Sequence, residues 1–258
     1  MKLKWKKALI TWWASWIWLE IAKEFSNQWA EVYIADINDE AWKKAEKIIE
    51  GSKFINIDVS SENSWIEWFK EIWEIDILVN NAWIIWNPEK MWAQNPEHIS
   101  IESWSLIHRI NLDSVMLWCK YAIKNMKNRK NCSIINMWSR SWKVWVPENC
   151  AYASTKSAIR NYSKSVALYC QKMWYDIRCN TVNPASIMTD MWETILNWND
   201  ELYKKLVSDI PMSRFWTPEE VAKTCLFLAS EDSSYITWSE IDVDWWILSW
   251  TKTSPWEK

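Results

Sequence analysis

Tyr152 and Lys156 lie four positions apart and could carry out acid–base chemistry on an alcohol. Residues 157–173 after them keep a helical period and contain no proline. Residues i and i+4 share one face of a helix, so the ammonium of Lys156 would lie near the phenol of Tyr152. A free phenol has a pKa of about 10, and a fixed cation nearby stabilises the phenolate. Such a phenol could exchange a proton with an alcohol near neutral pH. Alternatively, the spacing is an accident of an amphipathic helix.

Ser139 and Asn111 accompany this pair. Ser139 follows an apolar run, residues 134–137, that is typical of a buried strand. Asn111 lies inside a long helical pattern, residues 101–126, where its alternative role is to distort the helix. Ser, Tyr and Lys at this spacing, together with the Asn, resemble the short-chain dehydrogenase/reductase family.

The resemblance implies hydride transfer between a nicotinamide cofactor and a secondary alcohol or ketone. Tyr152 would exchange the hydroxyl proton, while Lys156 would lower the pKa of Tyr152 and bind the nicotinamide ribose. Ser139 would hydrogen-bond the reacting oxygen, and Asn111 would hold a water that links Lys156 to solvent. The alternative is a non-catalytic dinucleotide-binding sensor or scaffold on the same fold. A sensor needs no proton relay, so the complete set of four residues argues against it.

A strand, a turn and a helix follow one another near the start of the chain, in residues 8–11, 11–18 and 19–25. The turn reads T-W-W-A-S-W-I-W. With glycine in place of each tryptophan it becomes T-G-G-A-S-G-I-G, which is similar to the family's phosphate-binding turn. Glycines allow the tight turn, and N–H groups at the helix start hold the pyrophosphate. The residues expected to bind there are Thr11, Trp12, Ser15, Trp16, Ile17 and Trp18.

Further cofactor contacts are expected at the ends of later strands. Asp36 ends a strand pattern and follows Trp18 at close to the spacing of roughly 20 residues that is typical of the carboxylate binding an adenosine ribose. This acid would accept from both ribose hydroxyls and repel a 2′-phosphate, which favours NAD over NADP; a solvated strand end is the alternative. Residues 80–83, N-N-A-W, match the family's N-N-A-G apart from the last letter.

The resemblance adds cofactor contacts along the rest of the chain. Besides Tyr152 and Lys156, they are Asp58, Val59, Asn81, Ala82, Pro184, Ile187 and Thr189. Asp58 is equally well explained as a residue that starts a helix. Pro184-Ala185 departs from the family's usual Pro-Gly, which weakens the expected placement of the backbone near the nicotinamide.

The glycine and tryptophan contents are abnormal for a globular protein. Average usage would give about 18 glycines, whereas the chain has 1 glycine and 27 tryptophans. The tryptophans stand where turns need glycine, which favours φ > 0 and close backbone approach. We therefore hypothesise that most Trp letters stand for Gly, for example through a UGA codon that the source reads as glycine. Trp104 and Trp192 fit genuine tryptophans. If all are genuine, the chain is inactive or is a binding protein that uses indoles as stacking platforms.

Charge, cysteines and histidines exclude several classes of function. The net charge of −3 contains no block of like charges, which gives no case for nucleic acid or an anionic membrane as partner. No apolar run approaches the 18 residues of a membrane span. The 6 cysteines are scattered without a C-x-x-C pair, which indicates reduced thiols in a cytoplasmic protein. The 2 histidines are too few and isolated for a metal site.

Strand and helix patterns alternate along the chain, which predicts an α/β fold with a doubly wound parallel sheet. This Rossmann-like sheet would form a single domain, residues 1–258, with the cofactor at the carboxyl ends of the strands. Residues about 188–210 resemble the family's mobile substrate lid. The substrate would be a small or medium secondary alcohol, cyclic or acyclic, or a sterol-like ketone. By analogy with the family, helices bearing Asn111 and Tyr152 would form an interface of a homotetramer.

Overall fold

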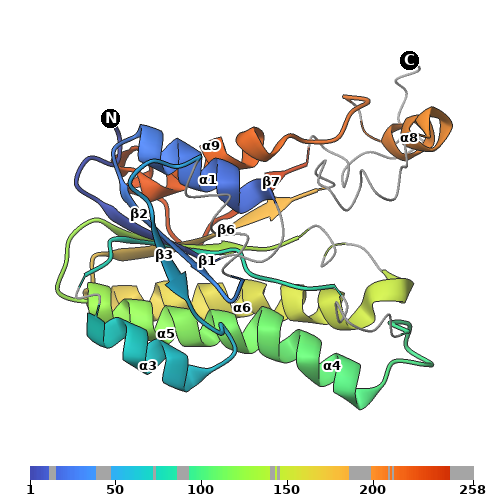
Figure 1. The fold of residues 1–258 in the computed structure, drawn as a ribbon, viewed down its shortest axis with the longest axis horizontal. Coiled ribbons are helices and arrows are strands. Elements are labelled where there is room, and N and C mark those ends of the chain that lie inside the picture. The colour runs from blue at the N-terminus through green and yellow to red at the C-terminus, as the bar shows by residue number, and fades with distance from the viewer. Residues whose placement is uncertain are drawn as a thin grey trace.

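The described part of the chain forms one parallel sheet with helices on both faces (Figure 1). The computed structural model describes residues 1–11, 16–38, 48–71, 74–85, 93–139, 143, 146–185, 199–208, 210 and 212–244.

Seven strands pair in the order β3-β2-β1-β4-β5-β6-β7, and every pairing is parallel. The strands are β1 (Lys7–Thr11), β2 (Glu31–Asp36), β3 (Lys53–Asn56), β4 (Ile77–Asn80), β5 (Cys132–Met137), β6 (Ile177–Pro184) and β7 (Glu240–Val243). The central strands β4, β5 and β6 are buried at every residue, as expected for a parallel sheet with helices on both faces. The predicted doubly wound α/β fold is confirmed.

Helices cover both faces of the sheet (Figure 1). The helices are α1 (Trp16–Asn27), α3 (Glu62–Glu71), α4 (Ile101–His108), α5 (Ser114–Met126), α6 (Cys150–Lys172), α8 (Asp200–Val207) and α9 (Pro218–Ala229). Helices α1 and α9 cover one face and bury Phe25 and Val221 against it. Helices α3, α5 and α6 cover the other face, where Ala122 and Ile159 belong to a second core. Helix α8 lies apart from both faces (Figure 1).

The strand order reverses between β1 and β4, because the chain builds β2 and β3 on one side of β1 and then returns to its other side. In open α/β sheets, ligands bind at such a switch point, in the crevice outside the carboxyl ends of the strands. Strand β1 ends at Thr11 and β4 ends at Asn80. The fold therefore places the candidate site beside the ends of these two strands.

The helical pattern of residues 101–126 is one continuous helical path with a π-helical turn, η1 (Arg109–Asp113), between α4 and α5. The N–H of Ser114 donates to the carbonyl of Arg109, five residues back, which is the hydrogen bond of a π-helix. The sequence predicted a helix here, but apolar residues keep their period through the turn and give no sign of the extra residue. Asn111 lies at the centre of this turn.

Strand β7 is short, since it begins only at Glu240 and ends at Val243. Trp238 has a φ of 67°, which turns the backbone out of the extended conformation. Its N–H donates to the carbonyl of Cys179 at 2.8 Å, and the N–H of Ser239 donates to Asn180 Oδ1 at 3.0 Å. These contacts hold the chain against β6 before the ladder starts.

No described helix is both long and apolar enough to cross a bilayer.

Candidate active site

Helix α6 presents Tyr152 and Lys156 on one face, as their spacing predicts. A 3-10 turn, η3 (Pro147–Asn149), precedes the helix, and the N–H of Cys150 donates to the carbonyl of Gln94 at 3.2 Å. Tyr152 is 8% exposed and Lys156 is 1% exposed. Lys156 Nζ lies 5.5 Å from the centroid of the Tyr152 ring and donates to the carbonyl of Met137, at the end of β5, at 3.3 Å. The structure therefore brings the phenol and the ammonium together in a buried place.

Burial controls the protonation of this pair. It raises the pKa of Tyr152 to about 12, an effect that a hydrogen bond from Ser139 opposes. It lowers the pKa of Lys156 to about 7. Both shifts favour the uncharged form, because a low-dielectric interior solvates neither charge. Burial therefore sets the direction of both shifts, and the lowering of the Tyr152 pKa by Lys156 stays a prediction.

Ser139 and Asn111 approach the pair from two other elements. Ser139 lies two residues beyond β5 and hydrogen-bonds Tyr152. Asn111 is fully buried in η1, where its Oδ1 accepts from the N–H of Ile84 and its Nδ2 donates to the carbonyl of Ile84, both at 2.8 Å. The same Nδ2 lies 3.4 Å from Thr155 Oγ1 on α6. Asn111 therefore ties the loop after β4 to the helix of Tyr152, and it also lies in a distorted helical turn, as its alternative reading predicted.

The ends of β1 and β4 are joined through a single hydroxyl. Thr11 Oγ1 accepts from the N–H groups of Asn81 at 2.9 Å and Ala82 at 3.0 Å. The side-chain amide of Asn81 is buried, and neither its Nδ2 nor its Oδ1 has a hydrogen-bond partner among the described residues. A buried amide without partners is costly unless a ligand supplies them. Asn81 is therefore a candidate contact for a polar ligand at the switch point.

Asp36 ends β2 and is 3% exposed. Burial raises its pKa to about 6, although the N–H of Asn38, which donates to Oδ1 at 2.6 Å, and the N–H of Ile37 act against this shift. The carboxylate is nevertheless the major form above pH 6. The second expected acid, Asp58, is exposed and accepts from the N–H and the hydroxyl of Ser60, both at 2.8 Å. It closes the turn before α3, as its helix-start alternative predicted.

The remaining predicted cofactor contacts divide into described and undescribed residues. Val59, Ile17, Trp18 and Pro184 are all buried; Ile17 and Trp18 belong to the core beneath α1, and Pro184 ends β6. Trp16 begins α1. Trp12, Ser15, Ile187 and Thr189 lie outside the described residues, as does about half of the expected lid; the described half contains α8.

Trp83 lies directly against the acid–base pair. Its ring centroid is 5.6 Å from that of Tyr152, at an interplanar angle of 60°. Lys156 Nζ is 5.6 Å from the centroid of the indole. The indole therefore contacts both side chains on which proton transfer would depend.

Known proteins resemble this chain over nearly its full length. A family profile described as enoyl-(acyl carrier protein) reductase matches residues 15–245. The NADP-dependent (R)-specific alcohol dehydrogenase of Lentilactobacillus kefiri is 33% identical over 247 residues, which cover 94% of this chain and 96% of the relative. The 3-beta-hydroxysteroid dehydrogenase of Comamonas testosteroni is 34% identical over 252 residues, with coverage of 94% and 96%. The cyclopentanol dehydrogenase of a Comamonas species is 31% identical over 227 residues, with coverage of 85% and 87%.

The chain belongs to the short-chain dehydrogenase/reductase family.

As a short-chain dehydrogenase/reductase, the protein is an oxidoreductase of a family that works with a nicotinamide dinucleotide. The polar groups at the carboxyl edge of its sheet fit such a cofactor: Asn81 offers an unpartnered buried amide, and Asp36 offers a buried carboxylate. Trp83 does not fit, because its indole already covers Lys156 and Tyr152. Asn81 and Asp36 therefore agree with the cofactor of the family, whereas a tryptophan at position 83 conflicts with it.

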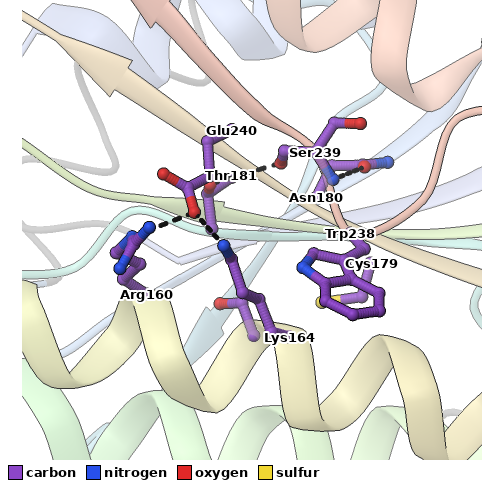
Figure 2. Close-up of a pocket in the computed structure, with 9 residues that line it drawn as sticks. Arg160, Lys164, Cys179, Asn180, Thr181, Trp238, Ser239 and Glu240 are labelled. Carbon is purple, nitrogen blue, oxygen red and sulfur yellow. Dashed lines mark hydrogen bonds and ion pairs between the residues drawn. The ribbon is translucent and has the colours of Figure 1, made fainter.

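A set of charges that the sequence did not predict lies on α6, the helix of this short-chain dehydrogenase/reductase that bears Tyr152. Arg160 and Lys164 continue the four-residue spacing of Tyr152 and Lys156 along α6. Figure 2 shows both pointing from the helix toward Glu240 at the start of β7. Arg160 Nε donates to Glu240 Oε1 at 2.9 Å, and Lys164 Nζ pairs with the same oxygen. The continued spacing was a signal, but nothing in the sequence indicated a partner 80 residues away.

Proposed function

We propose that the protein transfers a hydride reversibly between NAD(H) and a secondary alcohol or ketone. The observation that carries this proposal is the buried contact between Tyr152 and Lys156 on one turn of α6, with Ser139 hydrogen-bonded to the phenol. A buried phenol, ammonium and hydroxyl at the carboxyl edge of the sheet suit proton exchange with an alcohol. The names of the relatives, which act on alcohols and hydroxysteroids, support the same class of substrate.

In the direction of oxidation, Tyr152 would accept the hydroxyl proton through its phenolate oxygen. A bound nicotinamide would supply the hydride acceptor, chemistry that belongs to the cofactor. Lys156, when protonated, stabilises the phenolate and binds the nicotinamide ribose. Ser139 hydrogen-bonds the reacting oxygen, and Asn111 keeps the proton path to solvent in place. In reduction, the proton moves from Tyr152 to the carbonyl oxygen.

The preference for NAD rests on Asp36. Its carboxylate ends β2 and is ionised above a pH of about 6, so it can accept from ribose hydroxyls and repel a 2′-phosphate. The relative from Lentilactobacillus kefiri is NADP-dependent, so the family permits either choice. The other proposed cofactor contacts are Thr11, Trp12, Ser15, Trp16, Ile17, Trp18, Asp58, Val59, Asn81, Ala82, Tyr152, Lys156, Pro184, Ile187 and Thr189.

The substrate proposed is a small or medium secondary alcohol, cyclic or acyclic, or a sterol-like ketone. Residues 1–258 would act as one domain, with a substrate lid at about residues 188–210. The 6 cysteines are free, which agrees with a reducing, cytoplasmic location. The working form would be a homotetramer.

The decisive test is Tyr152→Phe, which removes the acidic hydroxyl and leaves the ring in place. Turnover in a screen of secondary alcohols with NAD should be lost, while NAD still binds in a calorimetric titration. Tyr235→Phe, at a fully exposed tyrosine outside α6, is the control and should keep full activity. Near-normal turnover in Tyr152→Phe would refute the assignment. The measurements should be made on two proteins, one with tryptophan and one with glycine at positions 12, 16, 18 and 83.

A further inference from the structure

We propose that the working protein carries glycine rather than tryptophan at positions 5, 29, 174 and 238. Among the described residues, six that are not glycine have positive φ, and four of them are Trp5 (69°), Trp29 (69°), Trp174 (57°) and Trp238 (67°). Only glycine enters this left-handed region freely, because a Cβ atom there approaches a carbonyl oxygen. The one glycine of the chain, Gly51, has a φ of 77° and lies in the same region.

Helices α1 and α6 end in the same hydrogen-bond pattern, with tryptophan at the left-handed position. After α1, the N–H of Trp29 donates to the backbone carbonyl of Ser26 at 2.8 Å. The N–H of Ala30 donates to the backbone carbonyl of Phe25 at 3.0 Å. This is the Schellman motif, whose left-handed residue is usually glycine. Trp29 occupies that residue's place.

The end of α6 repeats the motif. The N–H of Trp174 donates to the carbonyl of Gln171 at 3.1 Å, and the N–H of Tyr175 donates to that of Cys170 at 2.9 Å. Trp174 has the left-handed conformation between them. Two helices thus end in a C-cap whose left-handed position favours glycine, and the sequence has tryptophan at that position in both.

Trp5 and Trp238 occupy turns of two other kinds. The N–H of Lys6 donates to the carbonyl of Leu3 at 2.9 Å, and positive φ occurs at the second central residue, Trp5. This is the pattern of a type II turn, which requires φ > 0 at that residue and therefore favours glycine. Trp238 turns the chain against β6, and its indole stands beside Cys179 in Figure 2.

Burial does little to offset the strain at these positions. The residues Trp5, Trp29, Trp174 and Trp238 are 82%, 54%, 93% and 52% exposed. Lys4 Nζ lies 5.3 Å from the ring centroid of Trp5 and 5.8 Å from that of Trp29, contacts that are weak in water. Large apolar rings exposed at strained turns have neither a packing reason nor a conformational one.

A different observation in the core points the same way. The ring centroids of Trp65 on α3 and Trp118 on α5 are 2.9 Å apart at an interplanar angle of 76°. Aromatic pairs pack with centroids about 4.5–7 Å apart, so two edge-to-face indoles at this distance would overlap. The two rings cannot both occupy this space, which favours a small residue at one of the two positions.

The gene provides the first test, which does not depend on enzyme activity. We expect UGA at codons 5, 29, 174 and 238, and UGG at codon 104, since Trp104 stacks on His108 within α4 with ring centroids 4.3 Å apart. Peptide mass spectrometry of protein from its native source should then show glycine at the four positions and tryptophan at 104. UGG at any of the four codons, or tryptophan in the corresponding peptides, overturns the proposal for that position.

Recombinant protein provides the second test. Trp29→Gly and Trp174→Gly should each raise the midpoint of thermal unfolding by about 2–4 °C, because each relieves the strain of a left-handed tryptophan. Leu168→Gly, at an exposed interior position of α6, is the matched control and should lower the midpoint. If both cap variants lower the midpoint as the control does, the proposal is wrong. Neither test measures turnover, so a result against glycine at these positions can be distinguished from a failure of the proposed function.

Discussion

Tyr152 and Lys156 are buried so deeply that each favours its neutral form. The Tyr152 phenol keeps its proton up to a pH of about 12, whereas the Lys156 ammonium loses its proton above about 7. Proton acceptance by Tyr152 near neutral pH therefore depends on Lys156 remaining charged. Oxygen atoms of water or of a bound ribose would solvate the ammonium and raise its pKa.

Asp36 predicts a pH-dependent choice of cofactor. Its pKa is raised from 3.8 to about 6, so the group is neutral below this pH and no longer repels a 2′-phosphate. The preference for NAD over NADP should therefore weaken as the pH falls through about 6. Asp36→Asn should weaken NAD binding about 10- to 100-fold, the value of a charge-assisted hydrogen bond. Calorimetric titrations with both cofactors on either side of pH 6 would measure this.

The control for Asp36 is Glu50→Gln, which removes an exposed acid in a turn. It should leave the ratio of NAD to NADP affinity unchanged. If the ratio of NAD to NADP affinity changes neither with pH nor in Asp36→Asn, another group selects the cofactor.

At the level of elements, α6 organises the candidate site. Tyr152, Lys156, Arg160 and Lys164 form one stripe along it, and Glu240 holds the last two to the start of β7 (Figure 2). Hydrogen bonding to both cations keeps the pKa of Glu240 below its usual value, although partial burial acts in the other direction. We therefore expect the ion pairs to hold the rotation of α6 about its axis, and with it the direction of Tyr152.

Glu240→Gln tests this positioning role. Loss of the carboxylate should destabilise the protein by about 1–2 kcal/mol and lower kcat more than it raises KM, because Tyr152 is misaligned. Asp76→Asn is the control: it breaks an ion pair with Arg129 at the amino end of β4, on the opposite edge of the sheet. It should lower stability while leaving kcat intact. Equal effects of the two variants on kcat would reduce Glu240 to a purely structural role.

The fold and the Tyr152–Lys156 contact could be predicted because they depend on local periodicity. The apolar runs of strands, the periods of helices and a four-residue spacing can each be recognised within a short segment of the sequence. A helix distortion at Asn111 was predicted only as the alternative role of this residue. Its hydrogen bonds to Ile84, 27 residues away, could not be predicted because they join segments distant in the sequence. The pKa shifts were also missed, since they arise from burial that only the assembled fold provides.

At the scale of the whole molecule, apolar side chains remain exposed on the outer surface of α5 and α6. They include Met116 on α5 and Leu168 and Tyr169 on α6. These are the helices on which a homotetramer interface is expected, and a second copy of the chain would cover this surface. Burial of these residues between copies would also stiffen the helix that bears Tyr152.

Sedimentation velocity checks this arrangement. The unmodified chain should sediment as a tetramer, and Leu168→Glu combined with Tyr169→Lys should lower its mass to that of a smaller species. Ile66→Glu, an exposed apolar residue on α3, is the control and should leave the mass unchanged. If the unmodified chain sediments as a monomer, it has no such interface. If the double variant remains a tetramer, the interface lies elsewhere.

The hydroxyl of Thr11 accepts from the N–H groups of both Asn81 and Ala82, so the last residue of β1 is tied directly to the chain that follows β4. Loss of this hydroxyl in Thr11→Val would release both N–H groups at once. The spacing between the ends of the two strands therefore depends on one side chain.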